Sequence, residues 1–309
     1  MILTRLNIRQ NAMITLPPLR DIPVAVFRST DDAAPVLKGE KGSFKTLLKA
    51  VLVNGYGDKA PLGWTIQQED TNTAIFKSQD ATSNQHLLKI DHDTNSHGIR
   101  CSAGTALNSD GSLKNLFGLK DMGLDTPIAT GTVETPWVIV GHQKAFVVLL
   151  KSTYNNYFGS VLYFGDVPSL IADDLNNTVL WATRGYAYFK YNNNYNMWVN
   201  FPASFNQRLG DTPTTPISTL SAYNQASFPP LGNYSNESNQ LLLDKVWLRE
   251  NPVVRAQLSG IFVPSLLLPI EWNLENCPLP TFEDYIVARL SEHSTQSNIM
   301  VNTVSWVGV

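Results

Sequence analysis

The stretch WVIVGHQKAFVVLL, residues 137–150, is the part of the sequence that decides the fold. Two runs rich in Val, Ile and Phe, 137–141 and 144–150, are separated only by His142 and Gln143. Runs of this composition are typical of β-strands, and so short a connection is typical of a β-hairpin. The stretch therefore predicts two adjacent antiparallel strands.

Further runs with the same signature lie on both sides of the hairpin. Each is rich in β-branched and aromatic residues and is bounded by Gly, Asn, Asp or Pro, which is the pattern of short strands separated by turns. We therefore predict a mainly β fold, either a β-sandwich or a mixed α+β arrangement. The runs are TAIFKS (73–78), HLLKID (86–91), GIRCSAGTAL (98–107), SVLYFGD (160–166), TVLWAT (178–183), YAYFKY (186–191) and MWVNF (197–201).

One amphipathic helix is predicted over residues 43–54, within SFKTLLKAVLVNGYG. Ser43 is suited to cap its N-terminus, and Asn54-Gly55 suits the left-handed conformation that ends a helix. The helix is expected to lie on a sheet with Lys45 and Lys49 outward. Its apolar residues recur at helical spacing on one face: Phe44, Leu47, Leu48, Val51 and Leu52.

The chain divides into four predicted segments. Residues 1–34 form an N-terminal arm or docking segment, and 35–204 form the β-rich main domain. Residues 205–240, with four prolines and many Ser, Thr and Asn, form a surface loop excursion. Residues 241–309 form a C-terminal β segment that completes the fold. Within it, PTFEDYIVARLSEH (280–293) fits a helix or a strand equally well.

The composition points toward contacts with other proteins. Charged residues make up 16% of the chain and the net charge is −3, against about 25% charged residues in an ordinary soluble domain. Such a surface packs against protein neighbours at little desolvation cost. It gives no bulk attraction for nucleic acid. The most apolar run, 261–270, is too short to cross a membrane.

The segment DHDTNSHG, residues 91–98, is the strongest candidate for a site, and it has two interpretations. Its acids and histidines could hold a cation, but neighbouring side chains of a strand point to opposite faces. Asp and Asn are also typical turn residues. We favour a solvent-facing hairpin turn over 92–97. The potential ligands are Asp91, His92, Asp93 and His97, with His86 and Cys101 nearby.

No other pattern predicts chemistry. There is no GxSxG nucleophile elbow and no glycine-rich phosphate loop. The adjacent acids at 69–70 and 173–174 are interpreted as solvated loop residues, and Cys101 and Cys277 as buried thiols. We therefore predict no enzyme activity, no catalytic residue, no cofactor and no metal.

An aromatic-rich region around 184–201 has two interpretations. Tyrosine and tryptophan with polar tips suit sugar stacking or protein interfaces, but they are equally typical of cross-strand pairs in a sheet. The sheet interpretation is favoured. The possible interaction surface consists of Trp181, Tyr186, Tyr188, Tyr191 and Trp198.

Several segments together resemble a family of tailed-bacteriophage virion proteins. Residues 29–64 resemble its start, where Ala-Pro-Val-Leu and Gly lead into a helix that ends in Leu-Val-Asn-Gly-Tyr-Gly, followed by a Gly-Trp that Gly63-Trp64 matches. Further similar segments are the hairpin FKSQD…HLLKIDHDTNSHGIR, PWVIVGHQKAFVVLL (136–150), Phe164-Gly165-Asp166, and VVRAQLSGIFVPSL (253–266). The first 25 residues and the Asn-rich region 190–240 depart from the family pattern.

The resemblance implies a structural component of a tailed-phage virion, in the tail or baseplate, that acts by multivalent packing. Its partners would be other virion proteins and copies of itself, assembled in the cytoplasm of the host bacterium, and neither nucleic acid nor a membrane. A second hypothesis is a receptor- or carbohydrate-binding module that recognises a host-surface glycan through the aromatic region. A third is a polysaccharide-cleaving hydrolase.

Overall fold

The computed structural model describes residues 19–92, 98–117, 123–125, 133–151, 159–171, 174–182, 198–201, 218–224, 241, 243–250, 253–264, 268–289 and 298–308. Over these residues the protein is mainly β, with the predicted amphipathic helix packed against sheets, so the predicted fold class is confirmed. No helix among them is long and apolar enough to cross a membrane.

The largest sheet in the described part of the chain has eleven strands, all antiparallel to their neighbours. Its strands, in spatial order, are β18 (Tyr285–Arg289), β19 (Asn298–Asn302), β17 (Val253–Pro264), β16 (Leu243–Glu250), β15 (Ser218–Asn224), β14 (Trp198–Phe201), β13 (Thr178–Ala182), β12 (Gly159–Asp166), β11 (Ala145–Lys151), β10 (Trp137–His142) and β2 (Ala25–Arg28).

Strands β10 to β13 are buried on both faces. Successive side chains of a strand point to opposite sides, and here both sets are apolar. In β11, Val147 faces one hydrophobic cluster and Val148 faces the other. Trp181 and Leu180 divide in the same way in β13. These strands therefore form the middle layer of the molecule.

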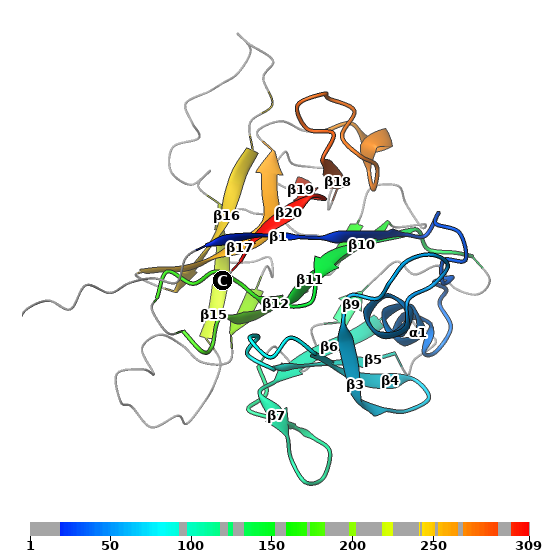
Figure 1. Ribbon diagram of the computed structural model, residues 1–309, viewed down its shortest axis with the longest axis vertical. Coiled ribbons are helices and arrows are strands. Elements are labelled where there is room, and N and C mark those ends of the chain that lie inside the picture. The colour runs from blue at the N-terminus through cyan, green and yellow to red at the C-terminus, as the bar shows by residue number, and fades with distance from the viewer. Residues whose placement is uncertain are drawn as a thin grey trace, which may run out of the picture.

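The first cluster lies between the middle layer and the C-terminal half of the same sheet. Leu248 of β16, Leu258 of β17 and Ile299 of β19 belong to the same cluster as Val147. The large sheet must therefore bend so that its two halves face each other, as in a β-sandwich. Figure 1 shows green β10–β12 between the yellow-to-red C-terminal strands and the unit that contains α1 and the cyan strands.

The second cluster lies between the middle layer and a smaller unit. This unit is a five-stranded sheet with the helix beside it, and both contribute apolar side chains to the cluster. A separate two-stranded hairpin extends from the sheet (Figure 1). The sheet contains β3 (Trp64–Glu69), β4 (Thr73–Ser78), β5 (Leu87–Asp91), β6 (Gly98–Gly104) and β9 (Gly123–Asp125), and the hairpin contains β7 (Ala106–Leu107) and β8 (Leu113–Lys114).

The helix spans the predicted residues but differs in its details. It begins as α1 (Ser43–Lys49) and continues as the π-helical turn η1 (Ala50–Asn54), ending at Gly55 with φ 77°. The prediction that Lys45 points outward is wrong: this side chain is buried and binds Glu69 Oε1 at 3.1 Å. The Lys45 ammonium group reaches Glu69 at the end of β3, so the aliphatic part of the Lys45 side chain is buried along the way.

The predicted N-terminal arm contains two strands. β1 (Arg20–Pro23) pairs with β20 (Ser305–Gly308), and β2 pairs with β10, so residues 20–28 are part of the chain's own sheets. Residues 1–18 lie outside the described residues. The predicted loop 205–240 also differs from the structure, because 218–224 form β15; its Thr219, Leu220 and Tyr223 are residues with a preference for strands.

The open alternative at 280–293 is resolved as a strand. Residues 285–289 form β18, where Ile286 and Ala288 face the first cluster and Val287 faces a third, smaller one. The strand is favoured because its neighbour β19 supplies an apolar partner for each face. A short 3-10 helix, η4 (Ile270–Trp272), precedes it.

Both outer strands of the large sheet are covered by the chain itself. Lys59 Nζ donates a hydrogen bond to the Val26 carbonyl of β2 at 2.7 Å. Beside β18, the backbone N–H of Leu274 donates to Val287 O at 2.8 Å, and that of Cys277 donates to Tyr285 O at 2.7 Å. These bonds leave fewer free backbone groups to which a foreign strand could add.

Gly260 of β17 supplies a prediction about this packing. Its φ is +74°, and a Cβ there would lie 2.2 Å from the Trp306 indole. Gly260→Ala should lower the free energy of unfolding by about 1–2 kcal/mol from the backbone and by about 1–3 kcal/mol from overpacking. Urea denaturation measures the loss.

The matched control is Gly111→Ala. Gly111 has φ +78°, but a Cβ there meets only the flexible end of the Gln68 side chain. The free energy of unfolding of Gly111→Ala should therefore fall only by the backbone contribution, without the loss from overpacking. Equal losses in the two variants would contradict the packing of Trp306 against β17.

Candidate functional site

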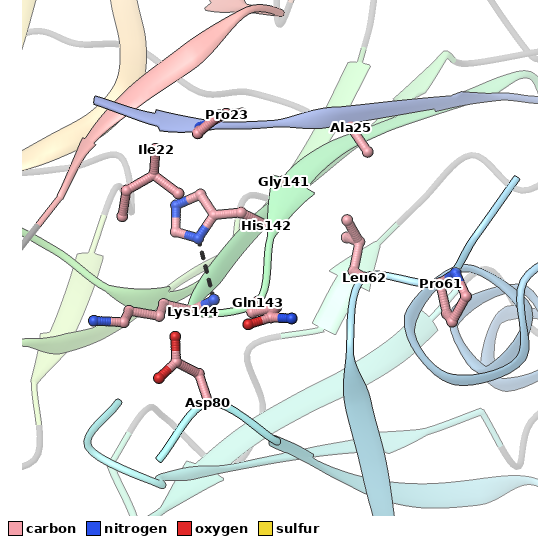
Figure 2. Close-up of a pocket in the computed structure, with 10 residues that line it drawn as sticks. All are labelled: Ile22, Pro23, Ala25, Pro61, Leu62, Asp80, Gly141, His142, Gln143 and Lys144. Carbon is pink, nitrogen blue, oxygen red and sulfur yellow. Dashed lines mark hydrogen bonds between the residues drawn. The ribbon is translucent and has the colours of Figure 1, made fainter. Parts of the chain in front are cut away.

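A pocket of about 310 Å³ lies beside the turn of the β10–β11 hairpin (Figure 2). One part of its wall is polar and the other is apolar. The polar residues are Asp80, His142, Gln143 and Lys144, and the remaining lining residues are Ile22, Pro23, Ala25, Pro61, Leu62 and Gly141.

Strand pairing brings these residues together from four parts of the sequence. The hairpin turn consists of Gln143 and Lys144, one residue later than the sequence suggested, because His142 pairs with Ala145. Gly141 pairs with Ala25, which places the junction of β1 and β2 over the turn. Asp80 follows β4, and in Figure 2 its carboxylate points toward Lys144.

His142 is held in one neutral form. Its Nδ1 accepts a hydrogen bond from the backbone N–H of Lys144 at 3.1 Å, and its ring stands edge-on to Trp306 with centroids 5.5 Å apart. Burial, assisted by the charge of Lys144, lowers its pKa to about 4. At neutral pH the proton is therefore on Nε2, which is a hydrogen-bond donor.

Asp80 is a charged acceptor. Burial opposes its ionisation, but hydrogen bonds from the Thr82 hydroxyl and backbone N–H, together with the charge of Lys144, outweigh burial and lower its pKa. Both bonds from Thr82 go to Oδ1, at 2.7 and 2.8 Å. Among the described residues none donates to Oδ2, so this oxygen can accept a bond from a ligand.

A buried polar network lies behind the pocket. Thr178 Oγ1 donates to Asp166 Oδ1 and lies 2.7 Å from His86 Nδ1. The backbone N–H of Asn84 donates to Asp166 Oδ2 at 2.9 Å, and the N–H of Asp166 donates to Lys144 O at 3.0 Å. Burial raises the pKa of Asp166 and lowers that of His86 to about 4.

This network joins two layers of the fold. Its hydrogen bonds join the loop after β4 to strands β12 and β13, and thus hold the five-stranded sheet against the middle layer. Both carboxylate oxygens of Asp166 and the Nδ1 atom of His86 bond protein partners.

The predicted solvent-facing turn within DHDTNSHG is wrong at His92. His92 is not in a solvent-facing turn: it is fully buried, because it follows Leu88 and Ile90 on the inward face of β5. Its Nδ1 accepts the backbone N–H of Phe44 at 3.3 Å. His92 thus caps α1, while the predicted cap Ser43 bonds with Lys38 and Val36 instead. Residues 93–97 lie outside the described residues.

The potential metal ligands do not converge in the described part of the chain. Cys101 lies in the second cluster, Cys277 lies in the third, and no disulfide joins them. His86 belongs to the network described above. No three His, Cys, Asp or Glu side chains among the described residues are placed to hold a metal ion.

The predicted aromatic surface is wrong at Trp181. This side chain is fully buried in the first cluster, because it points inward from the two-sided middle layer. Tyr186, Tyr188 and Tyr191 lie outside the described residues. Trp198 belongs to β14, and of its side chain nothing is described.

The sequence did not predict this pocket. Gln143 was predicted as part of the hairpin connection, Lys144 as the first residue of the following strand, and Asp80 only as part of the hairpin that begins with FKSQD. A polar turn between two wholly apolar strands was the available signal, but nothing local brings Asp80 to it.

In comparisons with known proteins, the chain matches no family model, and no curated protein matches it.

The His92 cap gives a prediction. His92→Ala removes the acceptor for Phe44 N–H, which should cost about 1 kcal/mol, and leaves a cavity that adds to the loss. His92→Asn retains an acceptor and should be the more stable variant. Urea denaturation compares the two; a wild-type midpoint for His92→Ala would show that the cap is unimportant.

The buried histidines give a pH prediction. His86 and His142 have folded pKa values of about 4 against an ordinary 6.5. Above pH 6.5 neither state binds a proton there. Between pH 6.5 and 4 the unfolded chain binds protons that the folded chain excludes, so stability falls as pH falls, by about 1.4 kcal/mol per pH unit for each histidine.

The measurement is the urea unfolding free energy at pH 7 and at pH 5. His86→Gln and His142→Gln should each show a smaller difference between the two pH values than the wild type, whatever their stability at pH 7. An unchanged difference in both variants would mean that these histidines bind protons in the folded protein.

Proposed function

We propose that the protein is a structural component of a tailed-phage virion, in the tail or baseplate, and that it acts by multivalent packing against other virion proteins and copies of itself. The resemblance of residues 29–64 and 253–266 to virion proteins supports this, as does the low content of charged residues. The observation that carries it is a braced surface segment between β12 and β13.

A buried ion pair braces this segment, so the interpretation of Asp174 as a solvated loop residue is wrong. Arg255 Nε donates to Asp174 Oδ2 at 2.9 Å and Nη2 donates to Oδ1 at 3.0 Å, with only 2% and 1% of the two side chains exposed. Ser169 Oγ adds a bond to Asp174 at 2.8 Å. The backbone N–H of Leu170 donates to Arg255 O at 2.7 Å.

The segment presents two leucines to the outside. Leu170 is 47% exposed and Leu175 is 73% exposed. Association costs free energy when side chains and loops must be ordered, and the ion pair with its neighbouring bonds already holds residues 169–170 and 174–176. Since other parts of the chain bond to both edge strands of the large sheet, assembly through such surface segments is favoured over strand addition.

The two other hypotheses receive less support. The glycan hypothesis placed recognition on the aromatic region. Trp181 of that region is buried and therefore cannot contact a glycan. The hydrolase hypothesis requires two carboxylates in one cleft. In the described pocket Asp80 is the single carboxylate of the wall, and Asp166 lies buried behind it.

The test is made on particles of the phage that encodes the chain. The protein should co-sediment with intact tailed particles in a density gradient, and a labelled antibody should mark one fixed position on the tail. Detection of the protein only in the soluble fraction of infected cells would contradict the proposal.

The braced segment has its own variants. Leu170→Asp with Leu175→Asp should reduce incorporation into particles by about tenfold or more, as expected for loss of apolar contact area, while the purified chain unfolds at an unchanged urea concentration. Val304→Asp, at a residue 53% exposed in a different turn, is the matched control. Equal incorporation of both variants would exclude the segment as a contact.

A further inference from the structure

We infer that the pocket beside the β10–β11 turn binds an uncharged, hydroxyl-rich ligand of the size of one sugar ring. Asp80, His142 and Gln143 recognise its hydroxyl groups, and Ile22, Pro23 and Leu62 cover its less polar face. This inference stands on the pocket alone and does not rest on the proposed virion role.

The charges of the wall favour an uncharged ligand. The Asp80 carboxylate lies near the Lys144 ammonium, whose charge contributes to lowering the Asp80 pKa. His142 is neutral at physiological pH because burial and Lys144 oppose its protonation. The wall thus carries one charge of each sign, which offers no net attraction to an anion or a cation, while an uncharged ligand does not depend on such an attraction.

The polar atoms of the wall include both donors and acceptors. Asp80 Oδ2 is an acceptor, since Thr82 occupies only Oδ1. His142 carries its proton on Nε2 because Nδ1 accepts the Lys144 N–H. The Gln143 amide can do both. A hydroxyl group also donates and accepts, so a ring with several hydroxyls matches this mixture.

The size and the apolar wall limit the ligand further. Small-molecule pockets run from roughly 300 to 1,000 Å³, and this pocket of about 310 Å³ is at the small end. Figure 2 shows Ile22, Pro23 and Ala25 along one side and Leu62 and Pro61 along another. Carbon-bound hydrogens of a sugar ring suit such surfaces.

The site is also preformed. The Gln143–Lys144 turn is fixed by the His142 bond and by the bond from Asp166 to Lys144. Asp80 is fixed by Thr82 and by Gln85, whose amide donates to the Asp80 carbonyl. A preformed site loses little conformational freedom when it binds a ligand.

Saturation-transfer NMR on the full chain tests the inference. The probes are glucose, galactose, N-acetylglucosamine and rhamnose, with butylammonium, butyrate and a neutral extended tripeptide as competitors. We expect saturable transfer to the ring protons of at least one sugar, with no displacement by the competitors. Transfer to none of the four sugars would overturn the inference, as would displacement by a competitor.

Paired variants locate the binding. Asp80→Asn keeps an acceptor for Thr82 but replaces the Oδ2 acceptor by a donor, and Gln143→Ala removes the amide. Each should weaken sugar binding by about tenfold, the effect of losing one such hydrogen bond. Asp58→Asn and Gln67→Ala, at exposed positions that do not line the pocket, are the matched controls.

The results separate binding from folding. All four variants should unfold at the urea concentration of the wild type, so a loss confined to the two pocket variants assigns the site. Equal binding by all four, or equal loss in the controls, would place the sugar elsewhere and overturn the inference. Particle localisation is unaffected by either result, so the virion role is tested separately.

Discussion

Burial of strands β10 to β13 on both faces is the constraint on which the other parts of the structure depend. A two-sided apolar layer must be covered twice, and the chain covers it with different material on each side. The C-terminal strands of the same sheet bend over one face, while the helix and the five-stranded sheet cover the other. Because both covers meet this one layer, positions far apart in sequence become neighbours at its ends, and the pocket lies at one such end.

The sequence carried the local elements of this arrangement. The apolar runs on either side of the 142–144 turn predicted the hairpin, and the spacing of Phe44, Leu47 and Val51 predicted the helix, because both patterns are set by neighbouring residues. What escaped prediction depends on distant partners. His92 caps a helix 48 residues earlier, and Lys45 is covered because Glu69 lies beneath it. Asp80 reaches the hairpin turn only through the pairing of whole sheets.

The region where the two covers meet contains a rigid network of buried hydrogen bonds and, beside it, polar side chains that line the pocket. Asp166, Thr178 and the Nδ1 atom of His86 form a chain of hydrogen bonds that holds the layers together. Asp80 and Gln143 stand in front of them and keep polar atoms directed outward. A buried network that fixes the backbone of its neighbours is what allows a small wall of side chains to keep a defined shape.

The pairing of β1 with β20 has a mechanical consequence. Arg20 lies opposite Gly308 and Pro23 lies opposite Ser305, so the two strands leave the sheet at the same end. A force that separates residue 20 from residue 308 opens this pair one rung at a time, as a zipper opens, and meets low resistance. A force along the strands of the middle layer instead loads many rungs at once. The pair of β1 and β20 is therefore weak against tension between residues 20 and 308, and a neighbour that pulls on the molecule transmits load best through β10–β13.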